Sequence, residues 1–309
     1  MGLHRPERRV LCGVYAPDDA QRRRVSSSPG TFGGIRLYGI KNGAEQNSVS
    51  APRFQERRRF LEQENKRVWL LDEVRGLSIL LMVIYHFFYD IVVLYGVNIP
   101  LFYSPGLNML RDFFAGVFIF ISGTAFRFSR NNLKRGVQCF GLGMVMTYVT
   151  AVALPNDPIV FGVLHLLGVC MVLFGLFGRF LDRVPVWAGL VGCVLLLILT
   201  WSMKDGFFGL PGLFTLDYPE FLTQSGLFFP FGITGAGFAS ADYFPLFPWL
   251  FVFLAGAFFG VPVKAGKMPA FFYKKHLPPL AFVGRYTIWI YLLHQPVLMG
   301  ICMLFFGWF

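Results

Sequence analysis

Seven stretches of mostly apolar residues, each close to 20 residues long, constrain this chain more than any other feature. An α-helix rises about 1.5 Å per residue, so roughly 20 residues cross the ~30 Å hydrocarbon core of a bilayer. A soluble domain carries roughly 25% charged residues, whereas this chain of 309 residues is 15% charged and 55% hydrophobic. The pattern predicts an all-α, polytopic integral membrane protein with about seven transmembrane helices, at 74–97, 113–130, 136–154, 159–179, 184–203, 245–263 and 282–307.

The connections between these stretches alternate in charge, which predicts their orientation. Arginine and lysine are enriched in the cytoplasmic loops of membrane proteins. Here they gather between spans two and three, four and five, and six and seven, while the other connections have few cations and tend to be acidic. We therefore expect a cytoplasmic N-terminus, Phe309 on the outer side, and a multi-pass protein of the cell membrane embedded in the lipid bilayer. The net charge of +11 belongs to this flanking pattern, so we expect no nucleic-acid partner.

Two polar segments lie outside the spans. The first 67 residues are rich in Arg, Gly and Ser, and we expect a disordered basic segment over 1–52 that leads into a charged juxtamembrane helix over 53–67. No apolar stretch follows the arginines, which argues against a signal peptide. The outer segment 204–244 is too long for a simple connection, and we expect a lid or a re-entrant segment over a site. The chain thus divides into an N-terminal segment, 1–67, and a transmembrane domain, 68–309.

Histidine and aspartate inside apolar spans are the candidate functional residues, because a charged side chain at the centre of a membrane helix costs ~2.5–3.5 kcal/mol on insertion scales. His86 and Asp90 share one face of the first span, so the carboxylate could orient the imidazole. His165 enters the fourth span from the outer side, and His294 lies in the outer half of the seventh. Each histidine alone also fits an ordinary hydrogen bond between helices. Three at similar depth predict a shared polar cavity, which Asp242 could join.

Arg75 adds a cation to the first span. It precedes His86 by eleven positions, and eleven steps of 100° return to nearly the same face about 16 Å away along the axis. A cation at the inner mouth and a base deeper in the membrane therefore share one stripe. Arg75 alone also fits a topology anchor whose charge reaches the interface. No CxxC motif or Cys/His cluster in the sequence suggests a metal site.

Several segments resemble those of membrane-bound acyltransferases. LDEVRGLSILLMVIYH resembles the first helix of the acyltransferase-3 family, in which a basic residue, ten intervening residues and a histidine form a motif that Arg75 and His86 match. FFAGVFIFISGTAFRFSR, FGVLHLLGV, DYFPLFPW and YTIWIYLLHQP resemble more specifically the bacterial relatives of heparan-α-glucosaminide N-acetyltransferase, the DUF1624 group. The resemblance covers about residues 67–300. The eukaryotic acetyltransferase carries its catalytic histidine in the loop after this helix, whereas residues 98–112 here contain no histidine, so its chemistry does not transfer directly.

The resemblance implies an acyl-CoA-dependent transmembrane acyltransferase. Such an enzyme moves an acetyl or other short acyl group from cytoplasmic acetyl-CoA or another acyl-CoA to a hydroxyl or amine of a saccharide at the outer face. The phosphates of CoA would favour cations at the inner edge. The candidates for binding them are Arg75, Arg127, Arg130 and Arg135.

The catalytic candidates are the intramembrane groups. His86 would act as a general base on the acceptor, with Asp90 fixing its tautomer, or would itself carry the acyl group as an intermediate. His165 and His294 complete the catalytic candidates. Ser122 and Thr124 are candidates for polarising the thioester carbonyl.

Two other classes of function compete with the acyltransferase. Intramembrane His and Asp also build proton relays, so the alternative is a proton-coupled transporter or an export subunit. Spans one to three and five to seven share no motif, however, whereas transporter folds often contain internal repeats. A noncatalytic membrane scaffold would leave the buried histidines without a role. Cleavage of an acyl-CoA thioester by the purified protein would separate these classes.

Overall fold

The computed structural model describes residues 67–307, so the expected disordered segment and all but the last residue of the expected juxtamembrane helix lie outside the described residues. Within 67–307, seven helices are long and apolar enough to cross a membrane, which confirms the prediction of an all-α protein with seven spans. These helices are α2 (Trp69–Tyr89) continued by the π-helix η1 (Asp90–Leu94), α3 (Pro105–Phe126), α4 (Asn132–Ala153), α5 (Val163–Leu181), α6 (Val186–Thr200) continued by the 3-10 helix η3 (Trp201–Asp205), α8 (Leu246–Lys264) and α10 (Thr287–Phe306).

Several helices begin before the apolar stretch does, because capping residues start them. The hydroxyl of Ser104 accepts a hydrogen bond from the Leu107 N–H at 3.3 Å, and a proline follows it at the first helical position, so α3 begins eight residues before the predicted span. Such a pair of N-cap and proline is favourable at a helix N-terminus. The side chain of Asn131 caps α4 in the same way. A short 3-10 helix, η2 (Pro100–Tyr103), precedes α3.

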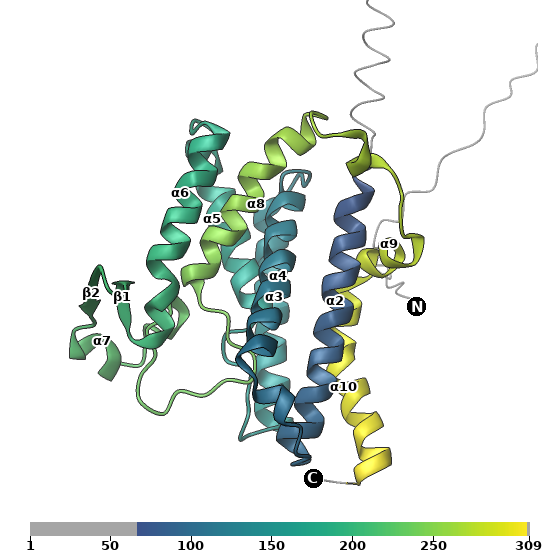
Figure 1. Cartoon of the computed structure of the whole chain (residues 1–309), viewed down its shortest axis with the longest axis vertical. Helices are drawn as coiled ribbons and strands as arrows, with labels where there is room; N and C mark the ends of the chain where they lie inside the picture. The colour runs from purple at the N-terminus through teal and green to yellow at the C-terminus, as the bar shows by residue number, and fades with distance from the viewer. Residues whose placement is uncertain (1–66, 308–309) are drawn as a thin grey trace, which may run out of the picture. The chain divides into compact units, whose positions relative to one another are not determined.

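The connections that carry the cations lie together at one end of the helices. Figure 1 shows the α3–α4 and α5–α6 connections and the C-terminal end of α8 beside the N-terminal end of α2. We call this the inner end and the opposite one the outer end. The arrangement agrees with the charge pattern, which requires cation-rich and cation-poor connections to lie at opposite ends of the helices. That the inner end faces the cytoplasm stays a prediction.

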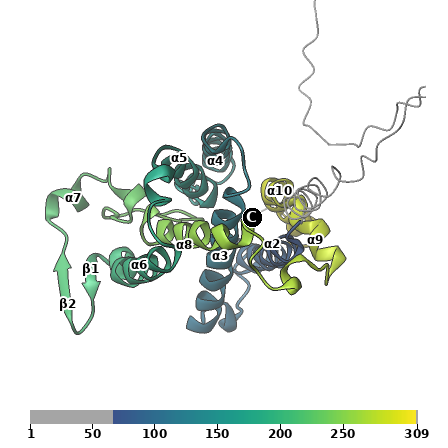
Figure 2. The ribbon, with the colours of Figure 1, turned by 90° about the horizontal axis from the view of Figure 1, so that it is seen from above.

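Small residues let the central helices approach closely. Figure 2 shows α8 between α6 and α3, with α4 and α5 paired beside them. A side chain at Gly123 of α3 would meet the backbone carbonyl of Phe253, and one at Gly256 of α8 would meet the carbonyl of Phe120. The buried Thr124 donates its hydroxyl to the carbonyl of Gly256 at 3.0 Å. Small residues and interhelical hydrogen bonds of this kind drive helix association in lipid, where the hydrophobic effect between helices is weak.

The predicted seventh span, 282–307, is broken in the structure. Helix α9 (Pro278–Arg285) follows the 3-10 helix η5 (Ala270–Tyr273), packs against the N-terminal part of α2, and ends just before α10 begins. Its contact with α2 is close because Gly76 and Gly284 face the opposing backbone. Figure 1 shows that α10 consequently runs beside the C-terminal part of α2.

A buried carboxylate fixes the start of α9. Glu73 of α2 is 4% exposed, and its Oε1 accepts hydrogen bonds from the N–H groups of His276 and Leu277 at 2.7 and 2.9 Å. The residue before α9 offers no side-chain cap of its own. The carboxylate on α2 therefore satisfies backbone donors that a helix N-terminus leaves unpaired.

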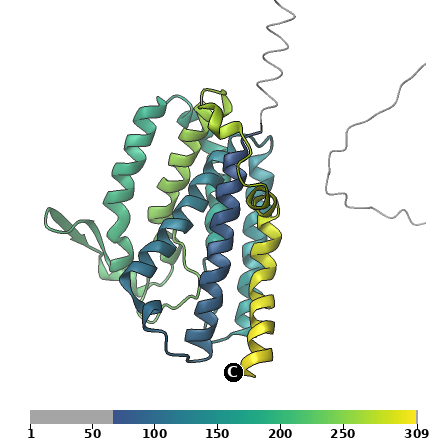
Figure 3. The same ribbon diagram turned by 45° about the vertical axis from the view of Figure 1, so that its right-hand side comes forward.

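The outer segment 204–244 stays outside the spans in the structure. It forms an antiparallel hairpin of β1 (Phe207–Leu210) and β2 (Phe214–Asp217), the short helix α7 (Glu220–Gln224) and the 3-10 turn η4 (Phe229–Phe231). Figure 3 shows the hairpin projecting sideways from the outer end of α6. No helix in the segment is long enough to span the membrane, and the lid and the re-entrant alternatives both stay predictions. Its last residues return to the helices and line a pocket.

Candidate active site

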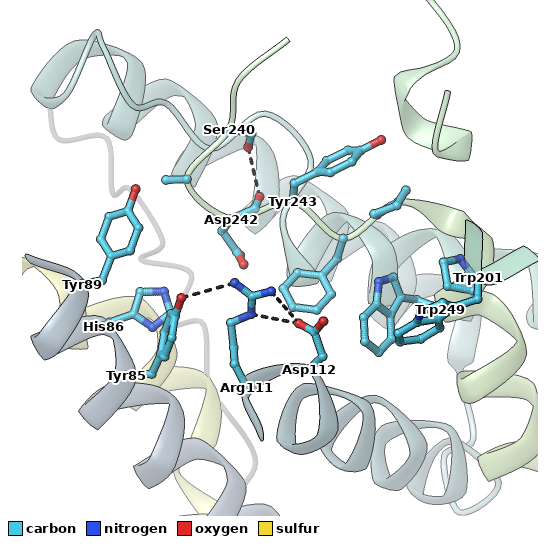
Figure 4. Close-up of a pocket in the computed structure, with 14 residues that line it drawn as sticks. Tyr85, His86, Tyr89, Arg111, Asp112, Trp201, Ser240, Asp242, Tyr243 and Trp249 are labelled. Carbon is cyan, nitrogen blue, oxygen red and sulfur yellow. Dashed lines mark hydrogen bonds and ion pairs between the residues drawn. The ribbon is translucent and has the colours of Figure 1, made fainter. Parts of the chain in front are cut away.

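A cavity of 320 Å³ opens at the outer end, between α2, α3 and the chain that leads into α8. Figure 4 shows His86 and Asp242 facing the space from one side and Trp249 from the other, with Arg111 between them. Each wall comes from a different part of the chain. The polar lining residues are Tyr85, His86, Tyr89, Arg111, Asp112, Ser240, Asp242 and Tyr243, and the others are mainly aromatic residues and prolines.

Backbone pairing holds Asp242 in place. The Phe244 N–H donates to the carbonyl of Phe161 at 2.9 Å, and the Ala241 N–H donates to that of Pro158. The Asp242 carboxylate then lies at the N-terminus of α5, where its Oδ2 accepts the Val163 N–H at 3.3 Å. A negative charge is favourable at this position because the helix dipole points its positive end there. Hydrogen bonds to the start of α5 and to the residues just before it therefore fix the segment 240–245 in place.

A buried tyrosine connects Asp242 to α10. The Tyr291 hydroxyl donates to Asp242 Oδ2 at 3.1 Å, and Tyr291 is 8% exposed. Burial raises the pKa of the Asp242 carboxyl above its usual value, while the Val163 N–H, the Tyr291 hydroxyl and the nearby histidines oppose this shift. The carboxylate is thus positioned by two helices, α5 and α10, and is poorly solvated.

His86 of the first span lines the cavity, and His294 of the last span lies directly beside it. Their ring centroids are 5.0 Å apart. His294 is only seven residues into α10, but the break after α9 places that part of α10 beside the outer part of α2. The structure therefore brings these two candidates together, although they stand 208 positions apart in the sequence.

The hydrogen bonds of these two rings fix which nitrogen is free. His86 Nδ1 lies 2.9 Å from the carbonyl oxygen of Met82, and His294 Nδ1 lies 2.7 Å from that of Tyr291. A carbonyl oxygen can only accept, so both neutral rings carry their proton on Nδ1. Each Nε2 then keeps a lone pair, which is the state that a general base requires. The Nε2 atom of His294 is buried and has no protein partner.

Asp90 does not orient His86, contrary to the expectation from their spacing. Its Oδ1 accepts a hydrogen bond from the Gln295 side-chain amide at 2.6 Å, while the main-chain carbonyl of Met82 occupies His86 Nδ1. The spacing of four residues places both groups on one helix face. Asp90 nevertheless binds the Gln295 amide of α10, and His86 binds the backbone of its own helix, so the two side chains do not bind each other. Asp90 is fully buried, at the start of the π-helical turn η1.

A smaller chamber of 40 Å³ adjoins the cavity on the side of Asp90. Both spaces are lined by His86, Tyr89 and Asp242. Three side chains of the chamber carry a buried polar atom without a protein partner, namely Asp90 Oδ2, His294 Nε2 and Gln295 Oε1. Such groups are ordinarily satisfied by ordered water, and a water molecule needs about 10–15 Å³ of this kind of space. The chamber has room for the few waters that these atoms require.

His165 belongs to a different environment and has the opposite tautomer. Its Nδ1 accepts the N–H of Gly162 at 3.3 Å, so the proton lies on Nε2, which is 3.4 Å from the Thr147 hydroxyl. The ring is 2% exposed and packs against Phe140 and Phe161. Both nitrogens are thus engaged, and the ring closes the N-terminus of α5. Of the three histidines predicted to share a cavity, His86 lines both the cavity and the chamber, His294 lines the chamber, and His165 lines neither.

Arg111 and Asp112 were missed by the sequence reasoning. Arg111 Nε donates to Asp112 Oδ1 at 2.8 Å, and Arg111 Nη1 donates to the Tyr85 hydroxyl at 3.3 Å, so the guanidinium projects toward His86 (Figure 4). Hydropathy placed the second span at 113–130 and left both residues in a loop. The Ser104–Pro105 pair was the available signal that the helix begins earlier and carries them into the site.

The four arginines proposed for CoA do not form one cluster. Arg75 lies 3.6 Å from Asp72, and Arg135 is near enough to interact with it. Arg130 and Arg135 are exposed. Arg127 instead donates to the Ala257 carbonyl and pairs with Asp182, and it lies over the ring of Phe174. It lines a separate inner pocket of 540 Å³.

The hydroxyls of Ser122 and Thr124 are not free to polarise a carbonyl. Ser122 donates to the carbonyl of Phe118 at 2.8 Å, and Thr124 donates to those of Phe120 and Gly256. Neither residue lines the cavity. Hydroxyls inside membrane helices commonly return to a backbone carbonyl one turn earlier, which is why this expectation was wrong. Among the described residues, no three His, Cys, Asp or Glu side chains come together as metal ligands.

Comparison with known proteins agrees with the resemblance seen in the motifs. No curated protein and no solved structure matches the chain. The profile of the family described as heparan-alpha-glucosaminide N-acetyltransferase, catalytic, matches residues 67–296. This range contains α2 through the first half of α10, and hence every residue that lines the cavity. The chain therefore belongs to the heparan-alpha-glucosaminide N-acetyltransferase catalytic family, and it is an N-acetyltransferase-like membrane enzyme by that membership.

Proposed function

We propose that this protein transfers an acetyl or other short acyl group from acyl-CoA to a hydroxyl or amine of a sugar bound in the outer cavity. One observation carries the proposal: His86 lines the outer cavity with its Nδ1 committed to a backbone carbonyl and its Nε2 free, and the His294 ring, held in the same way, lies beside it in the adjoining chamber. This arrangement supplies a base where an acceptor would bind. Family membership favours an enzyme over the transporter alternative.

His86 is the proposed general base. The acceptor oxygen or nitrogen attacks the thioester carbonyl carbon as its proton passes to His86 Nε2. The carbon–sulfur bond then breaks, and the leaving thiolate takes the proton back from the imidazolium, so the net change is transfer of the acyl group from sulfur to the acceptor. His294 lies beside this base. A positive charge on one ring disfavours protonation of the other ring, so we expect the pair to hold one proton at a time.

Arg111 and Asp242 are the proposed groups that position the acceptor and stabilise charge. The Arg111 guanidinium lies against the Tyr85 ring, with its carbon 5.7 Å from the ring centroid. It lines the cavity together with His86, and we propose that it stabilises the oxyanion that forms on the thioester carbonyl. Asp242, fixed by Val163 and Tyr291, offers its carboxylate to hydroxyl or amine protons of the acceptor.

The donor is proposed to enter from the inner end. His86 follows Trp69 by seventeen residues, about 26 Å along α2, so the reacting thioester must reach deep into the helices. Arg75, Arg130 and Arg135 are the proposed contacts for the CoA phosphates at the inner edge. Arg127 contributes through its Nη2, which is buried without a protein partner beside the inner pocket.

Acyl-CoA cleavage by purified protein in nanodiscs, with and without sugar acceptors, tests this proposal. His86→Asn retains a donor for the Met82 carbonyl but removes Nε2, so we expect a loss of ~10²–10⁴-fold in acyl transfer with little change in melting temperature. His165→Asn is the matched control, and it should lower the melting temperature more than the rate. Wild-type protein that cleaves no thioester with any acceptor, or full activity in the His86→Asn variant, would contradict the proposal.

A further inference from the structure

Another cavity, larger than the outer cavity, lies on the flank of the helices that faces lipid. It measures 970 Å³ and runs between α3 and α6, with α8 as its floor. Figure 2 shows α6 and α3 on either side of α8. Its lining is apolar except for Asn108 and Asp112, both in the first two turns of α3. We call it the lateral groove, and its other lining residues are Pro105, Met109, Phe113, Gly116, Val117, Phe120, Leu197, Trp201, Trp249 and Val252.

The lateral groove and the outer cavity are neighbours. Both are lined by Asp112, Trp201 and Trp249, and the two indole rings lie 6.0 Å apart. Figure 4 shows Asp112 between Arg111 and Trp249. The polar end of the groove, at Asp112, is thus the end that adjoins the cavity. From Asp112 to Phe120 the apolar part extends about 12 Å along α3 toward the membrane centre.

The groove is open to the surroundings of the helices. Met109 is 77% exposed and Phe113 is 61% exposed, and both belong to a membrane-spanning helix, so their side chains are available to lipid. Hydrocarbon chains pack against such a surface in a bilayer, whereas a polar group cannot remain there at low cost. An amphipathic molecule with its chain in the groove and its polar head in the cavity satisfies both requirements. A fully water-soluble acceptor would use only the cavity.

We propose that the acceptor is a lipid-linked sugar, whose hydrocarbon chain lies in the lateral groove while its sugar enters the cavity beside Arg111 and His86. The proposal rests on the proposed acyl transfer and names the class of acceptor. The shared lining of the two cavities by Asp112, Trp201 and Trp249 is the observation that carries it. The chain needs no extraction from the membrane, because the groove opens sideways into lipid.

Two substitutions block the groove at positions that do not line the cavity. Gly116 has no side chain, and a Cβ there would lie 3.5 Å from the Trp249 ring, which is ordinary contact, so a longer side chain continues into the groove. Gly116→Phe and Val117→Trp both fill it from α3. Gly141→Phe is the matched control, since Gly141 lies on α4 with nothing within 4 Å of its Cβ position.

The experiment compares two acceptors with the same sugar, a methyl glycoside and a long-chain alkyl glycoside, in nanodiscs. Wild type and Gly141→Phe should prefer the long-chain acceptor at least tenfold in kcat/KM, and this ratio should fall at least tenfold in both groove variants. Equal use of the two acceptors by wild type, or an unchanged ratio in folded groove variants, overturns the proposal. Thioester cleavage without any sugar is measured alongside and reports on the proposed function alone.

A binding measurement keeps the test independent of catalysis. An alkyl glycoside carrying a photoreactive group on its chain should label 105–120 in the His86→Asn protein, and Gly116→Phe should remove the label. Excess unlabelled alkyl glycoside should compete, whereas phosphatidylcholine should not. Equal competition by phosphatidylcholine would mean that ordinary membrane lipid fills the groove, which overturns the proposal.

Discussion

Replacing Glu73 with alanine should loosen α9 from α2. Its Oε1 accepts two backbone N–H groups, and hydrogen bonds to a charged group contribute roughly 1.5–3 kcal/mol each. Removing the carboxylate also relieves the cost of burying its charge, which offsets part of this loss. We therefore expect the free energy of unfolding to fall by about 2–4 kcal/mol. Glu73→Gln keeps one acceptor oxygen without the charge and should lose about half as much.

The assay is denaturation of detergent-solubilised protein, with hydrogen exchange as a local reading. The amides of His276 and Leu277 should exchange faster in Glu73→Ala, because their acceptor is gone. Glu220→Ala is the control, since Glu220 is an exposed carboxylate on α7 and its loss should stay within about 0.5 kcal/mol. A Glu73→Ala protein that unfolds like wild type and keeps both amides protected would refute the assignment of this carboxylate as the cap of α9.

Three further predictions address packing, pH and topology. Gly143→Ala places a Cβ 2.9 Å from the His165 ring and should destabilise the protein by about 1–3 kcal/mol in denaturation experiments, whereas Gly141→Ala, in open space, should not. Because burial raises the pKa of Asp242, the folded protein holds that proton more tightly than the unfolded chain does, so this contribution is present below the usual aspartate pKa and is lost as pH rises through the raised value. Melting temperatures measured against pH should show a shallower decline in Asp242→Asn than in wild type. A reporter inserted at Lys267 should score as cytoplasmic; an extracytoplasmic score would invert the topology.

The depth of a residue in the membrane could be predicted from the sequence, but the direction it faces could not. Hydropathy placed His86 and His294 at similar depth, and the structure brings their rings together. It placed His165 at similar depth too, yet that ring turns toward α4. These spans are apolar on nearly every side, so no polar stripe tells which face meets which neighbour. The roles of these residues in catalysis stay predictions.

The start of α3 shows a second limit of predicting helices from hydropathy. The first turns of a membrane helix that line a polar cavity are themselves polar, so a search for apolar stretches places the start of the helix too late along the chain. Arg111 and Asp112 were lost for this reason, although Ser104 and the following proline predict a helix start by capping rules. The break between α9 and α10 was also missed, because α9 depends on Glu73 of a distant helix.

The hydrogen bonds that hold the two histidines have a consequence for how this enzyme can change over evolution. In many sites, a carboxylate side chain orients the catalytic histidine, and one substitution can remove it. Here the Nδ1 protons of His86 and His294 are held by main-chain oxygens, which every amino acid possesses. Substitutions around the pair leave the base nitrogens pointing the same way. The residues that line the lateral groove are therefore free to diverge while the nitrogen of the proposed base keeps its direction.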